Sequence, residues 1–84
     1  MTIRAALRSY VLDNHLFTDD GSRLNDSDSF LETGILDSTG IMELILFVEE
    51  SQNLKVTDDE MVPENLDSID NLVAYIERKQ AAAS

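Results

Sequence analysis

Apolar side chains recur at helical spacing in three separate stretches of the chain. The stretches carry, in chain order, Ile3, Leu7, Tyr10 and Val11; Ile41, Leu44, Ile45 and Val48; and Ile69, Leu72, Val73 and Ile76. Spacings of three and four residues place these side chains on one face of an α-helix. The pattern therefore predicts three main helices whose apolar faces pack together.

Residues that favour helix ends set the expected limits of these helices. Thr2 and Ser68 stand where the N-caps of the first and last helices belong. The middle helix is expected to follow residues 36–38 and to end at residues 52–53, and the first helix to fade near residues 13–14. Residues 57–62 have the form of a capped helical start, and we expect Pro63 to stop this short helix after about one turn.

Residues 17–25 are turn-forming and lack apolar periodicity, which predicts a long first loop. Four large apolar residues come after it, and we expect them to pin the loop to the core because they would otherwise be exposed to water: they are Phe30, Leu31, Ile35 and Leu36. The sequence pattern therefore predicts an all-α fold: a small four-helix bundle of three main helices and one short helix. We expect one domain over residues 1–84, with residues 81–84 as a disordered tail.

The charge of the chain narrows the choice of partners. The 84 residues include 6 Lys and Arg against 17 Asp and Glu, a formal net charge of −11, while 43% of the residues are hydrophobic. That hydrophobic content is too high for a disordered acidic tail. The negative charge disfavours nucleic acids and anionic membranes and favours proteins with basic patches. Because residues 1–6 lack a signal-peptide core and no long apolar run occurs, we expect a cytoplasmic monomer.

The inventory of reactive side chains argues against an enzyme. The chain has no Cys and a single His, His15, which excludes disulfides, thiolate metal sites and multi-histidine sites. A calcium loop counted from Asp20 fails because Leu24 and Asn25 stand at its fifth and sixth positions. A body of this size leaves little room for an enclosed active site. We therefore expect no catalytic residue and no metal site, and assign His15 no role.

Ser38 is the one side chain whose position suggests chemistry. It follows Asp37 at the start of the middle helix, where unpaired N–H groups and the positive end of the helix dipole favour a negative group. A phosphate attached to this serine would be stabilised there. Asp and Ser are also preferred caps, so on position alone both residues could serve only to cap the helix.

Four segments of the chain resemble acyl carrier proteins. Residues 34–44, Gly-Ile-Leu-Asp-Ser-Thr-Gly-Ile-Met-Glu-Leu, are similar to the family segment that carries a modified serine, and residues 28–32, 56–61 and 66–76 are similar to family segments elsewhere. The resemblance covers essentially the whole chain. It implies a 4′-phosphopantetheine arm on Ser38, attached from coenzyme A by a phosphopantetheinyl transferase that recognises Asp37 or uses it to position a metal. The arm would supply the thiol that the chain lacks and would carry acyl groups as thioesters.

The middle helix is the expected docking surface for partner enzymes. Residues 37–64 contain eight acidic residues and one basic residue, a local sum of −7. Met42, Leu46 and Phe47 widen the apolar arc of the helix beyond its core stripe. We expect loading ligases, acyltransferases or synthases with basic patches to dock on a surface formed by Thr39, Met42, Glu43, Glu49 and Glu50.

Two departures from the family pattern bear on the pathway. Thr39 stands where the family has a large apolar residue, and Gln52–Asn53 replaces the family's Phe-Gly. These changes favour a specialised free-standing carrier, loaded by an adenylate-forming ligase, over the housekeeping carrier of fatty-acid synthesis. A peptidyl or aminoacyl carrier, an unmodified acidic interaction module and an acidic calcium sensor remain as alternatives.

Overall fold

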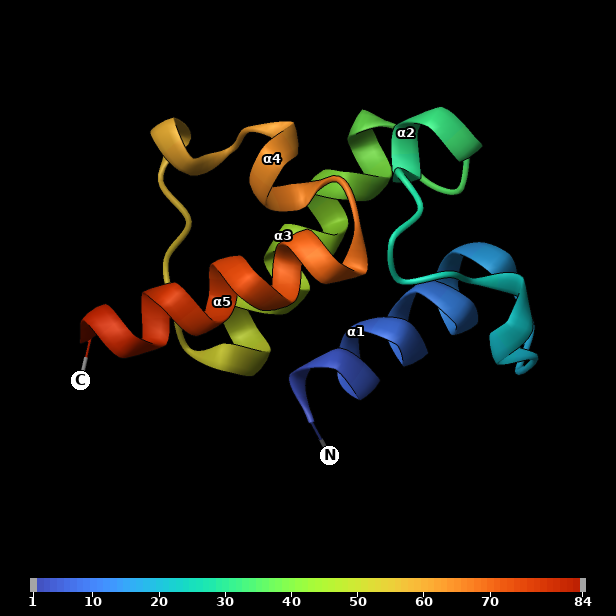
Figure 1. Cartoon of the computed structure of the whole chain (residues 1–84), viewed down its shortest axis with the longest axis horizontal. Helices are drawn as coiled ribbons and strands as arrows, with labels where there is room; N and C mark the ends of the chain where they lie inside the picture. Colours follow the sequence, from blue (N-terminus) through green and yellow to red (C-terminus); the bar gives the residue numbers. More distant parts are fainter. Residues whose placement is uncertain (1, 84) are drawn as a thin grey trace.

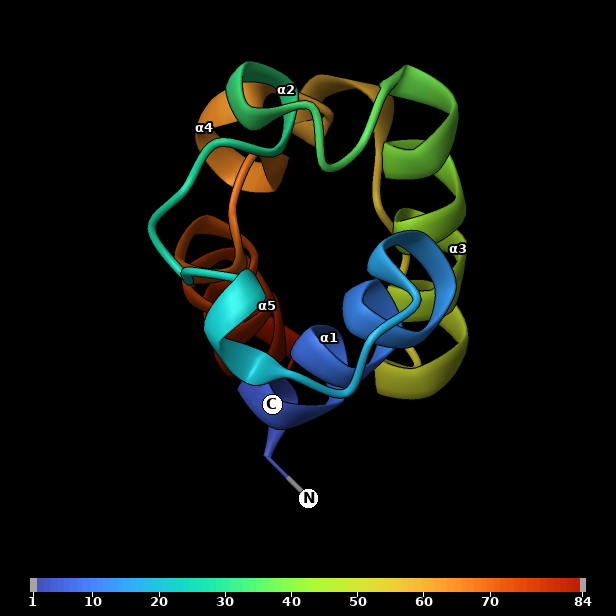
Figure 2. The ribbon, with the colours of Figure 1, turned by 90° about the vertical axis from the view of Figure 1, so that its right-hand side faces the viewer.

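The computed structural model describes residues 2–83, and all secondary structure within these residues is helical. The three main helices are α1 (Ile3–Val11), α3 (Ser38–Gln52) and α5 (Ile69–Ala83) (Figure 1). Single turns of helix lie between them: η1 (Leu12–Leu16), η2 (Gly21–Arg23), α2 (Phe30–Thr33), η3 (Asp58–Glu60) and α4 (Pro63–Leu66). In Figure 2, α3 and α5 lie on opposite sides of the bundle, α1 lies between them, and α2 and α4 lie at one end.

The core lies where the apolar faces of the main helices meet. Leu7 of α1, Leu44 of α3 and Ile76 of α5 are each at most 1% exposed. Phe30, the first residue of α2, is fully buried and closes the core from the first loop. Burial of each such side chain stabilises the fold by about 1.5–3 kcal/mol. The three predicted apolar faces are therefore confirmed.

The predicted caps of the main helices are confirmed. The Thr2 hydroxyl accepts a hydrogen bond from the Ala5 N–H at 3.1 Å, and the Ser68 hydroxyl accepts one from the Asn71 N–H at 3.0 Å. Helix α3 ends at Gln52 because Asn53 adopts a left-handed conformation with φ of 52°. Within the described residues, no helix is both long and apolar enough to cross a bilayer.

The first helical segment continues beyond its expected end. A single π-helical turn, η1, extends it to Leu16 and stops where Phe17 adopts a left-handed conformation with φ of 54°. The long first loop then follows as predicted, interrupted by the short turn η2. Arg8 holds this loop against α1, because its guanidinium donates to the carbonyls of Gly21 at 2.7 Å and Leu24 at 2.8 Å.

Two predictions about the short segments are wrong. The capped turn predicted within residues 57–62 is present as η3, with Thr57 and Glu60 forming a capping box, but it ends at Glu60 and not at Pro63. Pro63 is instead the first residue of α4, where its missing N–H costs no intrahelical hydrogen bond. Leu31 does not join the core but is 49% exposed, whereas Phe30 and Leu36 are buried as expected. The tail expected at residues 81–84 is helical as far as Ala83, and Ser84 lies outside the described residues.

Candidate functional site

Ser38 is the first residue of α3, and its side chain is exposed. Asp37 caps the helix: its Oδ1 accepts from the Gly40 N–H at 2.8 Å, and its carbonyl accepts from the Ile41 N–H at 2.9 Å. The N–H groups of Ser38 and Thr39 have no hydrogen-bond acceptor within residues 2–83. The serine hydroxyl therefore lies beside two free amide donors at the positive end of a 15-residue helix.

The backbone just before Ser38 depends on Gly34. This residue ends α2 in the left-handed conformation, with φ of 75°, and turns the chain toward α3. Beyond its two chain neighbours, no residue has an atom within 4 Å of the position that a Cβ would occupy, so the conformation and not space requires glycine here.

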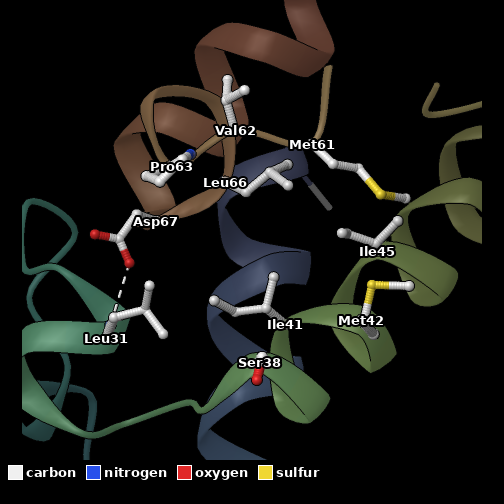
Figure 3. Close-up of a pocket in the computed structure, with 10 residues that line it drawn as sticks. All are labelled: Leu31, Ser38, Ile41, Met42, Ile45, Met61, Val62, Pro63, Leu66 and Asp67. Carbon is white, nitrogen blue, oxygen red and sulfur yellow. Dashed lines mark hydrogen bonds between the residues drawn. The ribbon is translucent and has the colours of Figure 1, made fainter. Parts of the chain in front are cut away.

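An apolar pocket of about 220 Å³ lies on one side of Ser38. Figure 3 shows Ser38 at one edge of it, with the α3 side chains facing the segment that leads into α4. The lining residues are Leu31, Ser38, Ile41, Met42, Ile45, Met61, Val62, Pro63, Leu66 and Asp67. The pocket can therefore shelter an apolar group held near the serine.

Asp67 joins two walls of this apolar pocket. Its carboxylate accepts from the Ser29 hydroxyl and from the Leu31 N–H, and its carbonyl accepts from the Phe30 N–H at 2.7 Å. These bonds attach α2 to the residue that ends α4 (Figure 3). A helix of four residues is too short to be stable on its own, so these tertiary hydrogen bonds stabilise α2.

A second, polar pocket of about 340 Å³ lies on the other side of Ser38. It is lined by His15, Gly34, Ile35, Leu36, Asp37, Thr39, Gly40 and Glu43. The Nε2 atom of His15 is buried and has no hydrogen-bond partner within the described residues. Sequence reasoning gave His15 no role, because its contact with the start of α3 depends on the folding of η1.

The predicted docking residues are not equivalent in the structure. Thr39, Glu43 and Glu50 are exposed, and Met42 is 48% exposed. Glu49 is only partly exposed, and its Oε2 accepts from the Val56 N–H at 2.9 Å. Its carboxylate therefore holds the segment after α3 against the helix.

Leu46 is an exposed apolar residue that was absent from the predicted docking set. It is 58% exposed and follows Met42 by one turn of α3. The sequence signal was present, since Leu46 lies outside the core stripe. Phe47, which shares that arc, is instead partly buried and stacks on Tyr10 with ring centroids 4.5 Å apart.

The charge around α3 is one-sided. The helix has three Glu and no Lys or Arg. The ion pairs of the described residues lie elsewhere: Arg4 with Asp26 and Asp70, Arg8 with Asp26, and Lys79 with Glu60. No group of three or more His, Asp or Glu suited to a metal ion occurs within the described part of the chain. The exposed face of α3 thus has uncompensated negative charge beside an apolar strip.

Comparisons with known proteins identify this small helical bundle as that of a carrier protein. The chain is 35% identical over 69 residues to D-alanyl carrier proteins of Streptococcus pyogenes serotypes M5, M49 and M1, which covers 82% of this chain and 86% of each relative. A solved structure of a holo acyl carrier protein from Nitrosomonas europaea matches the fold with a TM-score of 0.77 at 24% identity, covering 96% of this chain and 99% of that one. No protein-family model matches the chain.

The chain belongs to the carrier-protein family of these relatives, as the resemblance in its sequence predicts. Proteins of this class present a cargo to enzymes and are not enzymes themselves.

Proposed function

We propose that Ser38 bears a 4′-phosphopantetheine arm and that the protein presents an acyl or aminoacyl group on it as a thioester. The observation that carries this proposal is the exposed Ser38 hydroxyl at the capped start of α3, next to the unpaired N–H groups of Ser38 and Thr39. A phosphodiester at this place receives two amide donors and the favourable end of the helix dipole. The residues present therefore fit the group.

The chain supplies the attachment point, and the arm supplies the chemistry. With no Cys, the protein has no thiol of its own, and the bound arm contributes the thiol on which the thioester forms. In the loading reaction the Ser38 oxygen forms a bond to phosphorus while the phosphoanhydride bond to the nucleotide half of coenzyme A breaks. The hydroxyl proton leaves to a base of the transferase. Asp37 keeps Ser38 at the open end of the helix throughout, because its carboxylate holds the Gly40 N–H.

Partner enzymes dock on the exposed face of α3 in this proposal. Met42 and Leu46 provide an apolar strip one turn apart, and Glu43 and Glu50 provide negative charge near it. This surface is complementary to an enzyme patch that contains Arg or Lys next to an apolar contact. A phosphopantetheinyl transferase and a loading ligase are the first expected partners.

An aminoacyl group is the first cargo to test. The D-alanyl carrier proteins that share 35% identity with this chain are named for such a cargo. An adenylate-forming ligase that activates an amino acid is the matching loading enzyme. Fatty-acyl loading by the same route is the alternative outcome of the loading test.

Mass spectrometry tests the attachment directly. The purified protein, incubated with coenzyme A, Mg²⁺ and a broad-specificity transferase, is expected to gain the mass of one arm, and Ser38→Ala is expected to gain none. Ser51→Ala provides a matched control, since Ser51 is an exposed serine near the other end of α3 and should leave the gain unchanged. An unmodified wild-type protein, or an equal gain in Ser38→Ala, would reject the proposal.

A further inference from the structure

His15 contacts the first turn of α3 from the neighbouring turn η1. Its Cε1 atom lies 3.3 Å from the position that a Cβ on Gly40 would occupy, so the imidazole rests on the backbone of a residue that has no side chain. Gly40 is two residues after Ser38 in the same helical turn. The position of the imidazole and the position of the first turn of α3 are therefore linked.

The charged and titratable groups around His15 come from three segments. Tyr10 of α1 faces the ring, with centroids 5.7 Å apart and planes inclined by 54°. Glu43 of α3 and Asp37 of the preceding loop line the polar pocket together with His15. His15 has no ion pair within residues 2–83, although both carboxylates border the same pocket.

This packed arrangement suits a neutral imidazole and not an imidazolium. A proton on the buried Nε2 creates an N–H donor that has no acceptor at that place. It also places a positive charge beside the positive end of α3. The polar pocket offers the opposite environment, because it is an open space of about 340 Å³ lined by two carboxylates that can accept charge-assisted hydrogen bonds.

We propose that His15 is a protonation-dependent positioning residue for Ser38: the neutral imidazole packs on Gly40, and the protonated imidazole turns outward to Glu43 and Asp37. The outward position releases the contact between η1 and the first turn of α3. The serine is then held less firmly, and its modification slows on acidification. This inference rests on the proposed modification of Ser38 for its consequence, but the movement of His15 is a property of the unmodified protein.

Nuclear magnetic resonance of the unmodified protein tests the movement without any transferase. His15 is the only His in the chain, so its imidazole signals are unambiguous between about pH 8 and pH 5, where His side chains change charge. We expect the amide signals of Ser38, Thr39 and Gly40 to move together with the His15 ring signals. His15→Phe keeps an aromatic ring without a titrating group and should abolish this movement, and His15→Gln serves the same purpose if the Phe variant does not fold.

Glu43→Gln is the second variant in this test. It removes one of the two carboxylates that receive the protonated ring, so the amide movement should be smaller than in the wild type. Amide signals of the first turn that stay constant with pH, or that move equally in wild type and His15→Phe, would overturn the proposal.

The rate of Ser38 modification provides the functional readout. The ratio of the wild-type rate to the His15→Phe rate is expected to fall by about threefold or more between pH 8 and pH 6, since small displacements of a reacting group have large effects on rate. Using a ratio removes the transferase's own pH dependence. A constant ratio would overturn the positioning role. A Ser38 that is never modified would instead defeat the proposed function, and the two failures are distinguished because the amide signals are measured independently of modification.

Discussion

Asp37 has two possible roles: it caps α3, and a transferase could recognise its carboxylate. Substitutions can separate these roles. Its carboxylate accepts from the Gly40 N–H at 2.8 Å, so Asp37→Ala should cost about 1 kcal/mol in the free energy of unfolding, measured by urea denaturation. Asp37→Asn keeps a capping oxygen and should leave stability almost unchanged. If a transferase also recognises the carboxylate, modification of Ser38 slows in Asp37→Asn although the fold is intact. An equal rate in wild type and Asp37→Asn would limit Asp37 to the capping role.

Phe17 has an unfavourable backbone conformation and little compensating contact. Its φ is 54° and its side chain is 82% exposed. The left-handed conformation costs an L-residue roughly 1–2 kcal/mol and costs glycine almost nothing, so Phe17→Gly should raise the free energy of unfolding by up to about 1 kcal/mol. Thr18→Gly is the matched control, since Thr18 has no positive φ and glycine there should destabilise the protein. A Phe17→Gly variant that melts below wild type would show that the exposed ring stabilises the fold.

At the scale of the elements, the helix boundaries that depend on neighbouring residues could be predicted from the sequence. The elements that depend on contacts between distant residues could not. The start of α3 was predicted close to Ser38, where the helix begins, because the cap at Asp37 and the apolar stripe are both local. Helix α2 was missed because only four residues form it and Asp67, far along the chain, holds it in place. The candidate serine could be predicted from the motif, whereas the packing of His15 on Gly40 could not, because the two residues meet only after η1 folds.

The Glu60 carboxylate links the segment between α3 and α5 to α5. Glu60 accepts from Lys79 at 2.8 Å and from the Thr57 N–H, and these bonds lower the pKa of Glu60 from 4.5 to about 2. The pKa of this carboxyl is lower in the folded protein than in the unfolded chain, so the ionised carboxylate stabilises the fold at any pH above the unfolded-state pKa. This stability is lost as the pH falls from about 4.5 toward 2.

Lys79→Met should therefore lower the melting temperature at neutral pH and reduce its decline between about pH 5 and pH 2. Arg78→Met is the matched control, because Arg78 is next in the chain and contacts Asn65 but no carboxylate. Its melting temperature should show the wild-type decline. Parallel pH profiles of wild type and Lys79→Met would mean that the ion pair does not set the acid response.

At the scale of the whole molecule, the distribution of charge matters more than the net charge of −11. Arg4 and Arg8 neutralise carboxylates at the contact of α1, the first loop and α5, while the exposed face of α3 keeps Glu43 and Glu50 unpaired within the described residues. Electrostatic repulsion between carboxylates is therefore concentrated on the face of α3, where partner enzymes with basic patches are proposed to bind and would reduce it. Salt screens charges over about 10 Å at 0.1 M, so added salt or Mg²⁺ should raise the melting temperature.

Removing charge from this face should mimic the effect of salt. The double variant Glu43→Gln, Glu50→Gln should melt higher than wild type at low ionic strength, and the difference should shrink as salt is added, because screening already removes the same repulsion. Asp26→Asn is the matched control: its carboxylate is paired with Arg4 and Arg8, so neutralising it should lower the melting temperature at every salt concentration. If the melting temperature of the wild-type protein does not change with ionic strength, the negative face of α3 does not strain the free protein, and its charge acts only when a partner approaches.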